Sequence, residues 1–315
     1  MTIHEEQSAR DAYRDALVEL MAADPTIYCI DTDTGLFSGV DFGAAARRYV
    51  NLGIAEQNAV GVAAGLAASG KQPFVNTMAA FAGTRALEQV KIDVAYNRLP
   101  VRIVATHGGL SAGHLGPTHH ALEDIATMRV LPNMTVVVPG DARQTRDAIR
   151  QASGVRGPVY VRLGRKPAPA LPPSARAPFR LGAAEHLRAG GDAVAFACGA
   201  YPIAAALAAH DALGAEGIGL AVVNVHTVKP LDRDAIVAAA RGRPVVTIED
   251  HWAHGGLGGA IAELLSEIAP ARVHRIGLPD AFAADAGDHP FLLERYGITA
   301  DAVTRAVRSM LGGAR

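Results

Sequence analysis

The sequence predicts an α/β protein made of two doubly wound domains, and three observations support this prediction. Short apolar runs rich in Val and Ile alternate with helical patterns along the chain, which is typical of parallel sheets covered by helices on both faces. A proline-rich segment interrupts the alternation after residue 166, and the alternation then restarts. The length of 315 residues suits about two domains of roughly 150 residues each.

The first domain is predicted over residues 1–166, with a parallel sheet. Residues 8–22 form an amphipathic pattern that places Ala12, Ala16, Leu17 and Leu20 on one helix face. By the same reasoning from spacing and apolar runs, helices are expected at 57–69, 83–96 and 142–153, and strands at 26–31, 48–54, 72–78, 100–107, 134–141 and 158–165.

The stretch "KPAPALPPSARAP" contains five prolines and no apolar period, so we expect a linker over residues 167–185. The second, smaller domain is predicted over residues 186–315, with a mostly parallel sheet. Its strands are expected at 192–199, 219–226, 244–250 and 272–278, and its helices at 204–213, 234–240, 259–268 and 300–311.

The composition excludes several classes of protein. Half of the residues are hydrophobic, and 30 basic residues nearly balance 31 acidic ones, so no charge excess indicates a nucleic-acid partner. The apolar stretches are broken by glycine and fall short of a membrane span, and the N-terminus lacks an apolar targeting region. We therefore expect a soluble, cytoplasmic protein with no membrane partner. Cys29 and Cys198 lie in apolar runs and are expected to be small buried thiols.

Polar side chains follow the strands of the first predicted sheet. Ligands bind at the carboxyl ends of parallel strands, so we expect these side chains to lie near one another. A long loop, "GGLSAGHLGPTHH", comes directly after one of these strands, and loops of this length are often functional. The strand ends carry Asp31, Asp33, Glu56, Thr77, His107 and Arg165, and the loop carries His114, His119 and His120.

Other chemistries fit less well. The two aspartates and the histidines could ligate zinc, but the histidine spacing of a helical zinc site is missing, and we expect no metal ligands in this chain. No GxSxG or GxGxxG motif of a hydrolase or a dinucleotide-binding protein is present. The stretch "GGLGGA" at 255–260 could hold an anion at a helix N-terminus, although close backbone packing is favoured.

Three stretches together resemble the C-terminal half of transketolase. They are "NLGIAEQNAVGVAAGLAASG", "VATHGGLSAGHLGPTHHALEDIATMRVLPNMTVVVPGD" and "NVHTVKPLD", and the likeness extends from about Arg10 to the end. It implies a pyrimidine-binding domain followed by a transketolase C-terminal domain. The chain resembles the shorter subunit of a split, thiamine diphosphate-dependent transketolase, which would transfer a two-carbon ketol unit from a ketose phosphate donor to an aldehyde or a specialised acceptor.

The resemblance implies which residues hold the cofactor. Glu56 matches the acid that hydrogen-bonds a nitrogen of the aminopyrimidine ring and so promotes deprotonation of the thiazolium carbon. Its apolar neighbours would desolvate this carboxyl group and help it to hold the shared proton. Phe81 matches the aromatic residue that stacks on the pyrimidine, Met78 stands where the family often has a second aromatic residue, and Asp33 matches an acid near the thiazolium.

The resemblance also implies substrate contacts. His119 matches the histidine that reaches the reaction centre and could shuttle a proton. His107, Arg165 and Arg10 match residues that contact the substrate phosphate, for which arginine is well suited. The implied catalytic residues are therefore Glu56, His119 and His107.

Two departures from the family pattern matter for the substrate. Transketolases usually read "GEDGPTHQ" where this chain reads "GHLGPTHH". Leu115 replaces an acid that recognises a hydroxyl group of the sugar donor, and His120 replaces a common glutamine. Because a leucine cannot accept that hydrogen bond, we expect an altered donor or a specialised pathway.

The family's diphosphate motif, GDG followed by Asn, does not occur in this chain. We therefore expect it to hold only the pyrimidine end of the cofactor, while the diphosphate and its Mg²⁺ are held by an N-terminal transketolase subunit as its partner. An α2β2 assembly would place the cofactor at a subunit interface.

Three alternatives remain open. The chain could be the β-subunit of a 2-oxo-acid dehydrogenase decarboxylating component, which shares "GIAEQ", or a deoxyxylulose-phosphate synthase-like enzyme, which shares the arginine-bearing strand. It could also be a non-catalytic subunit that has kept the fold. The retained Glu56, Phe81 and His119 argue against this last reading.

Overall fold

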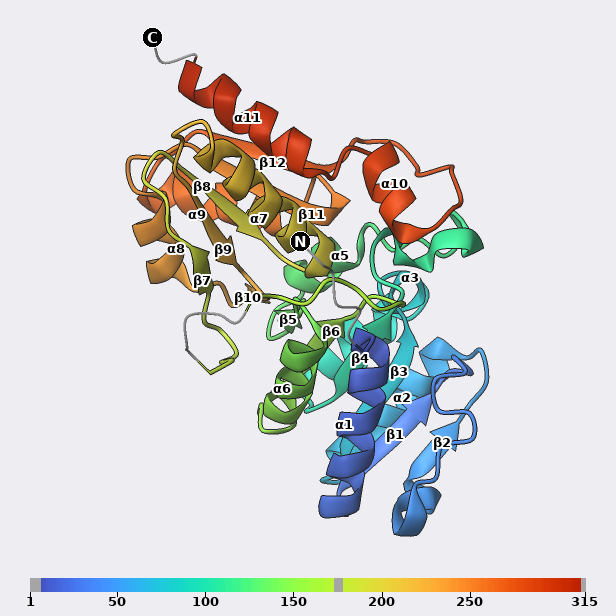
Figure 1. Ribbon diagram of the computed structural model, residues 1–315. Coiled ribbons are helices and arrows are strands. Elements are labelled where there is room, and N and C mark those ends of the chain that lie inside the picture. The colour runs from blue at the N-terminus through green and yellow to red at the C-terminus, as the bar shows by residue number, and fades with distance from the viewer. Residues whose placement is uncertain (1–6, 173–177, 313–315) are drawn as a thin grey trace.

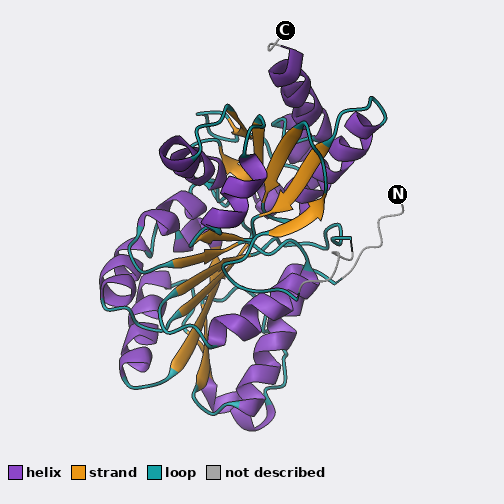
Figure 2. Cartoon of the chain, turned by 90° about the vertical axis from the view of Figure 1, so that its left-hand side faces the viewer, coloured by secondary structure: helices purple, strands orange, loops and turns teal. Residues whose placement is uncertain are grey.

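The computed structural model describes residues 7–172 and 178–312. Two domains lie one above the other, and each has a central sheet with helices on both faces (Figures 1 and 2). The predicted class, two α/β domains with mostly parallel sheets, is confirmed. None of the helices within the described ranges is long and apolar enough to cross a membrane.

The first sheet has seven strands in the order β10-β5-β6-β4-β3-β1-β2. All pairs are parallel except β10 with β5, so the predicted parallel sheet of the first domain is confirmed, with one antiparallel strand added at its edge. The antiparallel strand β10 comes from beyond the linker and has only three residues, too few to give a sequence pattern. The strands are β1 (Ile27–Asp31), β2 (Tyr49–Asn51), β3 (Gln72–Met78), β4 (Arg102–Thr106), β5 (Thr135–Val137), β6 (Val159–Arg162) and β10 (Thr227–Lys229).

The helices of the first domain mostly begin at the predicted places. Side chains of Ser8 and Asp141 cap the first and last of them by accepting backbone N–H groups. Residues 83–86 form a turn after α3, so the helix predicted over 83–96 begins later, at Leu87, and continues to Tyr96, first as α4 and then as a π-helix. The helices are α1 (Ala9–Ala23), α2 (Glu56–Ala68), α3 (Ala79–Ala82), α4 (Leu87–Gln89), α5 (Asp124–Val130) and α6 (Ala142–Ser153), with a π-helix at Val90–Tyr96.

Alternate residues of the first sheet serve two different cores. Ile30, Val75 and Ile103 pack with α2 and the π-helix, whereas Cys29 and Phe74 pack with α1 and α6 on the opposite face. This alternation follows from the two-residue period of a strand. Both faces of the sheet are therefore covered, and only the strand ends remain for a ligand.

The second sheet has the order β12-β11-β8-β9-β7, with β7 antiparallel at one edge. The sequence patterns did not reveal β7, β10, α5 and α10, all of which have seven residues or fewer. The elements are β7 (Glu185–Arg188), β8 (Ala193–Ala197), α7 (Ala200–Gly214), β9 (Leu220–Asn224), α8 (Arg233–Ala240), β11 (Val245–Trp252), α9 (Leu257–Ile268), β12 (Val273–Leu278), α10 (His289–Arg295) and α11 (Ala300–Gly312).

The proline-rich segment packs against the first domain where it is described. Gln151 on α6 donates a hydrogen bond to the carbonyl of Phe179 at 2.6 Å and accepts one from the N–H of Leu181 at 2.9 Å. Residues 173–177 of the predicted linker lie outside the described residues. Beyond this segment β7 starts the second sheet.

Candidate active site

The carboxyl ends of five parallel strands, β2, β1, β3, β4 and β6, lie side by side at one edge of the first sheet. The order of connection changes direction at β1, since β2 lies on one side of it and β3 on the other. Crevices at such reversals are the usual ligand sites of α/β sheets. Five of the predicted site residues end or follow these strands: Asp33, Glu56, Met78, His107 and Arg165.

A group of contacting side chains forms around Glu56. Glu56 opens α2 and is 2% exposed, and its Oε2 accepts a hydrogen bond from Arg85 Nη1 at 2.7 Å. The Arg85 guanidinium lies 4.3 Å from the centroid of the Phe81 ring. The same ring meets the imidazole of His119 edge-on at 5.4 Å. The structure thus brings together three predicted residues and adds Arg85, which the sequence patterns did not reveal.

Local structure explains how these side chains reach one another. Gly53 has a φ of +71°, and its N–H donates to the Asn51 side chain at 2.9 Å, which turns the chain sharply from β2 into α2. Phe81 lies on α3, which follows β3 without a loop. His119 comes from the long loop after β4. The segments after β2, β3 and β4 therefore supply the acid, the ring and the imidazole at the same end of the sheet.

A second group is basic and surrounds His107. This residue is 2% exposed, and its Nδ1 lies 2.9 Å from Thr106 Oγ1. Burial, together with the positive charges of Arg165, Arg10 and His119, lowers the pKa of His107 to about 3. These residues follow β4 and β6 or lie on α1 and the histidine loop, and all three are close enough to His107 to lower its pKa. A cluster of positive groups beside a neutral imidazole is suited to bind an anion.

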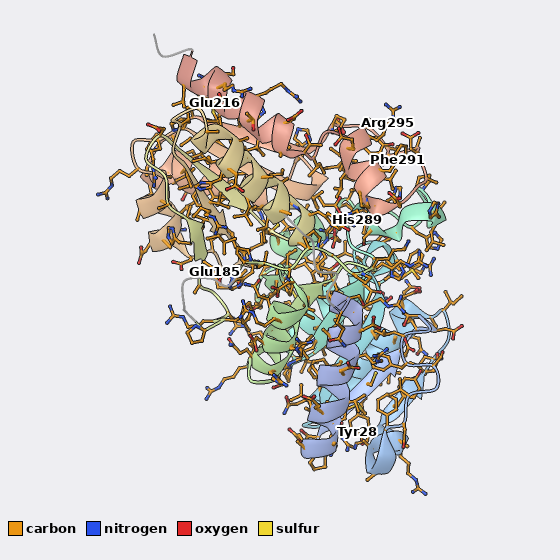
Figure 3. All side chains as sticks on the ribbon, in the orientation of Figure 1. Tyr28, Glu185, Glu216, His289, Phe291 and Arg295 are labelled. Carbon is orange, nitrogen blue, oxygen red and sulfur yellow. The ribbon has the colours of Figure 1, made fainter. Side chains whose placement is uncertain are left out.

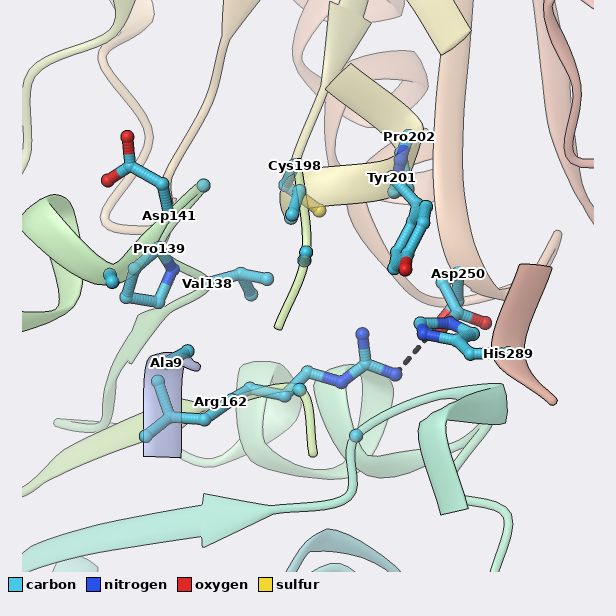
Figure 4. A pocket seen from close by; sticks show the side chains of 18 of the residues that line it. Ala9, Val138, Pro139, Asp141, Arg162, Cys198, Tyr201, Pro202, Asp250 and His289 are labelled. Atoms are coloured by element: carbon cyan, nitrogen blue, oxygen red, sulfur yellow. Dashed lines mark hydrogen bonds and ion pairs between the residues drawn. The ribbon is translucent and has the colours of Figure 1, made fainter. Parts of the chain in front are cut away.

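The second domain holds the loop that carries His119. Both carboxylate oxygens of Asp250, on β11, accept the N–H of Leu110 at 3.1 Å, and His289 Nε2 contacts Asp250 Oδ2 at 2.9 Å. Arg162 donates to the carbonyl oxygens of Ala121 at 3.0 Å and Asp250 at 2.7 Å. Figure 4 shows Arg162, Asp250 and His289 side by side. In Figure 3, His289 lies near the level where the two domains meet.

Within this loop, the two residues that depart from the family pattern have different surroundings. Leu115 is 40% exposed. His120 is buried and lines a small pocket with Trp252 and Phe282 of the second domain, and burial lowers its pKa. His120 therefore contributes to packing between the domains, whereas Leu115 is accessible from solvent.

Two predicted cofactor residues are not joined to the Glu56 group. Asp33 is exposed, with a φ of +61°, and accepts a hydrogen bond from Asn51 Nδ2 at 3.2 Å. Met78 is half-buried at the end of β3. Asp31, by contrast, is buried and accepts hydrogen bonds from Asn76 Nδ2 at 2.7 Å and from the Tyr49 hydroxyl at 3.0 Å, so it serves the sheet itself.

The "GGLGGA" stretch does hold an anion, and that anion is a side chain of the same chain. Glu249, 1% exposed, accepts the N–H groups of Leu257 and Gly258 at 2.7 Å each, at the N-terminus of α9. A Cβ atom at Gly256 would lie 2.1 Å from Glu249 Oε2. The close packing that the sequence favoured is therefore confirmed, and the helix N-terminus is already filled.

The cavity shown in Figure 4 lies between the domains and is a separate feature. Its lining includes Lys166, Cys198 and Tyr201 but none of the predicted site residues. Among the described residues, no group of three or more His, Cys, Asp or Glu side chains is arranged to hold a metal ion.

Comparison with family models divides the chain into two parts. Residues 5–169 match the model described as the transketolase pyrimidine-binding domain. Residues 182–303 match the transketolase C-terminal domain. The first match alone covers more than half of the chain.

Characterised relatives point in the same direction. The 6-deoxy-6-sulfo-D-fructose transketolase subunit SqwH of Clostridium sp. is 41% identical over 97% of this chain and 95% of its own length. One of the subunits of the apulose-4-phosphate transketolase of Phocaeicola vulgatus is 39% identical over 95% of this chain and 96% of its own length. A 1-deoxy-D-xylulose-5-phosphate synthase 2 of Geobacter sulfurreducens is 40% identical over 84% of this chain, which spans 42% of that enzyme.

Among solved structures, a split gene transketolase described as an inactive beta4 tetramer superposes with a TM-score of 0.85 and 44% identity, covering 96% of this chain and 97% of that chain. The transketolase of Campylobacter jejuni gives a TM-score of 0.82 at 18% identity and covers 98% of this chain. The match covers 48% of that protein, which is therefore about twice as long as this chain. At 18% identity the likeness concerns the fold alone.

Proposed function

Since this chain belongs to the transketolase family, we propose that it is the C-terminal subunit of a two-chain, thiamine diphosphate-dependent transketolase. The enzyme transfers a two-carbon ketol unit from a ketose donor with an anionic group to an aldehyde or a specialised acceptor. The observation that carries this proposal is the Glu56–Arg85–Phe81 arrangement, in which a planar hydrogen-bond donor stacks on an aromatic ring and pairs with a buried carboxylate.

The side chains fit the pyrimidine end of the cofactor on chemical grounds. An aminopyrimidine is flat, stacks on aromatic rings and carries nitrogen atoms that pair with a carboxyl group. The Arg85 guanidinium is also flat and makes both kinds of contact, with Phe81 at 4.3 Å and with Glu56 at 2.7 Å. It therefore stands in for the ring, which supports Glu56 and Phe81 as cofactor-binding residues. Met78 and Asp33 complete the proposed cofactor set from the neighbouring strand ends.

When bound, thiamine diphosphate supplies the carbon nucleophile that accepts the two-carbon unit. Glu56 would pair with a nitrogen of the pyrimidine, and its 2% exposure would keep water away from the shared proton. The Nδ1 atom of His119 lies 2.9 Å from Thr118 Oγ1, which leaves Nε2 to move a proton at the substrate. Glu56 and His119 are thus the acid–base residues of the proposal.

The basic group supplies the substrate's anchor. Arg10 and Arg165 would hold a phosphate or sulfonate group by charge-assisted hydrogen bonds, with the neutral His107 imidazole as a further partner at the reaction centre. Both named transketolase relatives act on substrates whose names include a sulfo or phosphate group. Leu115 at the position of a donor-reading acid supports a specialised donor for this chain as well.

The partner would be an N-terminal subunit that holds the diphosphate and Mg²⁺, because this chain has no GDG motif. Next to Glu56, the exposed positions of α2 are uncharged, and Ile54, Ile92 and Tyr96 are 73%, 46% and 79% exposed nearby. Exposed apolar side chains with charged residues such as Glu88 and Lys91 around them resemble the apolar centre and polar rim of a protein interface. A related split transketolase chain forms an inactive beta4 tetramer, which supports an α2β2 active form. We expect this assembly in the cytoplasm.

A second candidate is a synthase-like activity that joins a pyruvate-derived unit to an aldehyde phosphate, since a deoxyxylulose-phosphate synthase is 40% identical over 84% of the chain. The split-subunit relatives cover more of this chain and match it nearly end to end, which favours the transketolase reading. A 2-oxo-acid dehydrogenase β-subunit is less favoured, because the relatives named above are transketolases and synthases.

The test is a titration with thiamine diphosphate and Mg²⁺, followed by near-ultraviolet circular dichroism. It is made on the chain alone and on its mixture with the product of the neighbouring transketolase N-terminal reading frame. We expect saturable binding only in the mixture, followed by donor consumption when an acceptor aldehyde is added. Tight binding to the chain alone would contradict the split site, and pyruvate consumption in place of ketose consumption would favour the synthase.

A further inference from the structure

Arg85 makes two contacts that compete with the function proposed for its neighbours. Its Nη1 donates to Glu56 at 2.7 Å, and its guanidinium covers the Phe81 ring at 4.3 Å from the centroid. These are the same two contacts that the aminopyrimidine would make. A ring and a guanidinium cannot both cover the same face of Phe81, so the two occupants compete for this position.

The two occupants also require different charge states of Glu56. An arginine at hydrogen-bond distance favours the ionised carboxylate, whereas the proposed function requires Glu56 to hold a proton against the pyrimidine nitrogen. Arg85 therefore has to leave before Glu56 can act. Its side chain is 44% exposed, in contrast to 2% for Glu56, so solvent is within its reach.

We propose that Arg85 is a placeholder for the pyrimidine ring, a positioning residue that keeps Glu56 ionised and Phe81 covered until the cofactor displaces it. This inference rests on the proposed function. Without Arg85, the empty subunit would contain an unpaired buried carboxylate, which is costly in a protein interior. With Arg85, the carboxylate is held in one orientation, ready for the ring.

Loading has a definite proton balance. Arg85 stays protonated as it moves to solvent, and Glu56 takes up a proton from solution and shares it with the ring nitrogen. No bond other than hydrogen bonds forms or breaks on the protein. Cofactor binding is therefore coupled to the uptake of up to one proton per site.

The experiment is calorimetric titration of the two-subunit complex with thiamine diphosphate and Mg²⁺ in buffers of different ionisation enthalpy. It compares the parent with Arg85→Met, which keeps the length of the side chain but removes the hydrogen-bond donors. We expect the variant to bind about tenfold more tightly, since no charge-assisted hydrogen bond has to be broken first. It should also take up fewer protons, because no Arg85–Glu56 ion pair has to be separated.

Arg156→Met is the matched control. Arg156 is exposed and precedes β6, at the opposite edge of the sheet, so its substitution should change neither quantity. Arg85→Lys is the conservative variant. It keeps a cation for Glu56 without a flat group for Phe81, and it should retain the proton uptake of the parent while binding only a few times more tightly.

Three outcomes are distinguishable. Tighter binding with reduced proton uptake in Arg85→Met supports the placeholder. Equal or weaker binding with the uptake of the parent overturns it, since Arg85 would then be a fixed wall of the cofactor site. Absence of binding to the parent complex overturns the proposed function and the placeholder with it. If Arg85→Met does not fold, the affinity of Arg85→Lys decides between the first two outcomes: binding a few times tighter than the parent supports the placeholder, and equal or weaker binding overturns it.

Discussion

Each domain has a buried glutamate near a helix N-terminus, but the two glutamates are held in different ways. Glu249 accepts two backbone N–H groups of its own domain at 2.7 Å, a closed arrangement that no ligand can enter. Glu56 is equally buried, yet its hydrogen-bond partner is the half-exposed side chain of Arg85. A carboxylate fixed by backbone is committed to the fold, whereas one held by a movable side chain remains available to a ligand.

A pair of histidines repeats the contrast. His107 follows β4 and His226 follows β9, and in each case Nδ1 lies beside a threonine hydroxyl, at 2.9 and 3.0 Å. Burial lowers both pKa values, to about 3 for His107 and about 4 for His226. The charges around them differ in sign, since the neighbours of His107 are cations and those of His226 are Glu185 and Asp232. Of the two histidines, only His107 lies in an unbalanced positive field.

The largest expected effect comes from replacing the carboxyl group of Glu56 with an uncharged amide. Glu56→Gln should lower kcat of the assembled enzyme by about 10²–10⁴-fold, because an amide cannot hold and return a proton. Steady-state kinetics with saturating cofactor measures it, and Glu249→Gln is the matched control with kcat within about twofold of the parent. Equal turnover by Glu56→Gln and the parent would mean that Glu56, like Glu249, has no catalytic role, and it would favour a non-catalytic subunit.

The next effect concerns the carboxylate that is fixed by backbone. Glu249→Gln should lower the free energy of unfolding by about 1.5–3 kcal/mol, because one of two charge-assisted hydrogen bonds is lost at a buried site. Urea denaturation of the chain alone measures the change. Unchanged stability would mean that the N-terminus of α9 does not need this anion. Glu249 would then not be the structural counterpart of Glu56.

Much of this architecture could be predicted from sequence, and the limits have physical causes. Period-2 and period-3.6 patterns are local, so the long elements and the strand ends that carry Glu56 and His107 were found. Short elements such as β10 and α10 have too few residues to show a period, and their positions depend on distant partners.

The missed site residues follow the same rule. Asp250 holds the N–H of Leu110, 140 residues away in sequence, and no local pattern encodes such a contact. Arg85 left a weak signal, because it lies four residues after Phe81, a spacing that places side chains close together in helical segments. The roles of Glu56, Phe81 and His119 could be inferred only from the family resemblance, since spacing alone did not prove that they converge.

A smaller effect tests the difference between the charges that surround His107 and those that surround His226. Between pH 6.5 and about 3 the unfolded chain binds a proton at residue 107 that the folded chain refuses, so His107 makes stability fall with decreasing pH by up to 1.36 kcal/mol per unit. A phosphate or sulfonate that neutralises Arg10 and Arg165 should raise the pKa of His107 by about one unit or more. His226, beside acids, should not respond.

Proton NMR titration of the histidine rings, with and without inorganic phosphate, measures both shifts. His107→Asn assigns the responding signal, and it should also flatten the dependence of stability on pH in this range. Equal shifts for the two histidines, or none for His107, would mean that the basic group of the first domain does not bind anions.

The smallest expected effect tests whether the histidine loop of the first domain also selects the sugar donor. Leu115 is 40% exposed on the histidine loop, and Leu115→Asp restores the acid that the family usually has there. We expect kcat/KM for xylulose 5-phosphate to rise about fivefold, since a net hydrogen bond contributes about 1 kcal/mol, while activity with the enzyme's own donor falls. His114→Asp adds the same charge one residue earlier and should leave the ratio between donors unchanged. If both variants raise activity equally, the loop acts through its charge alone, and donor selection has to arise elsewhere.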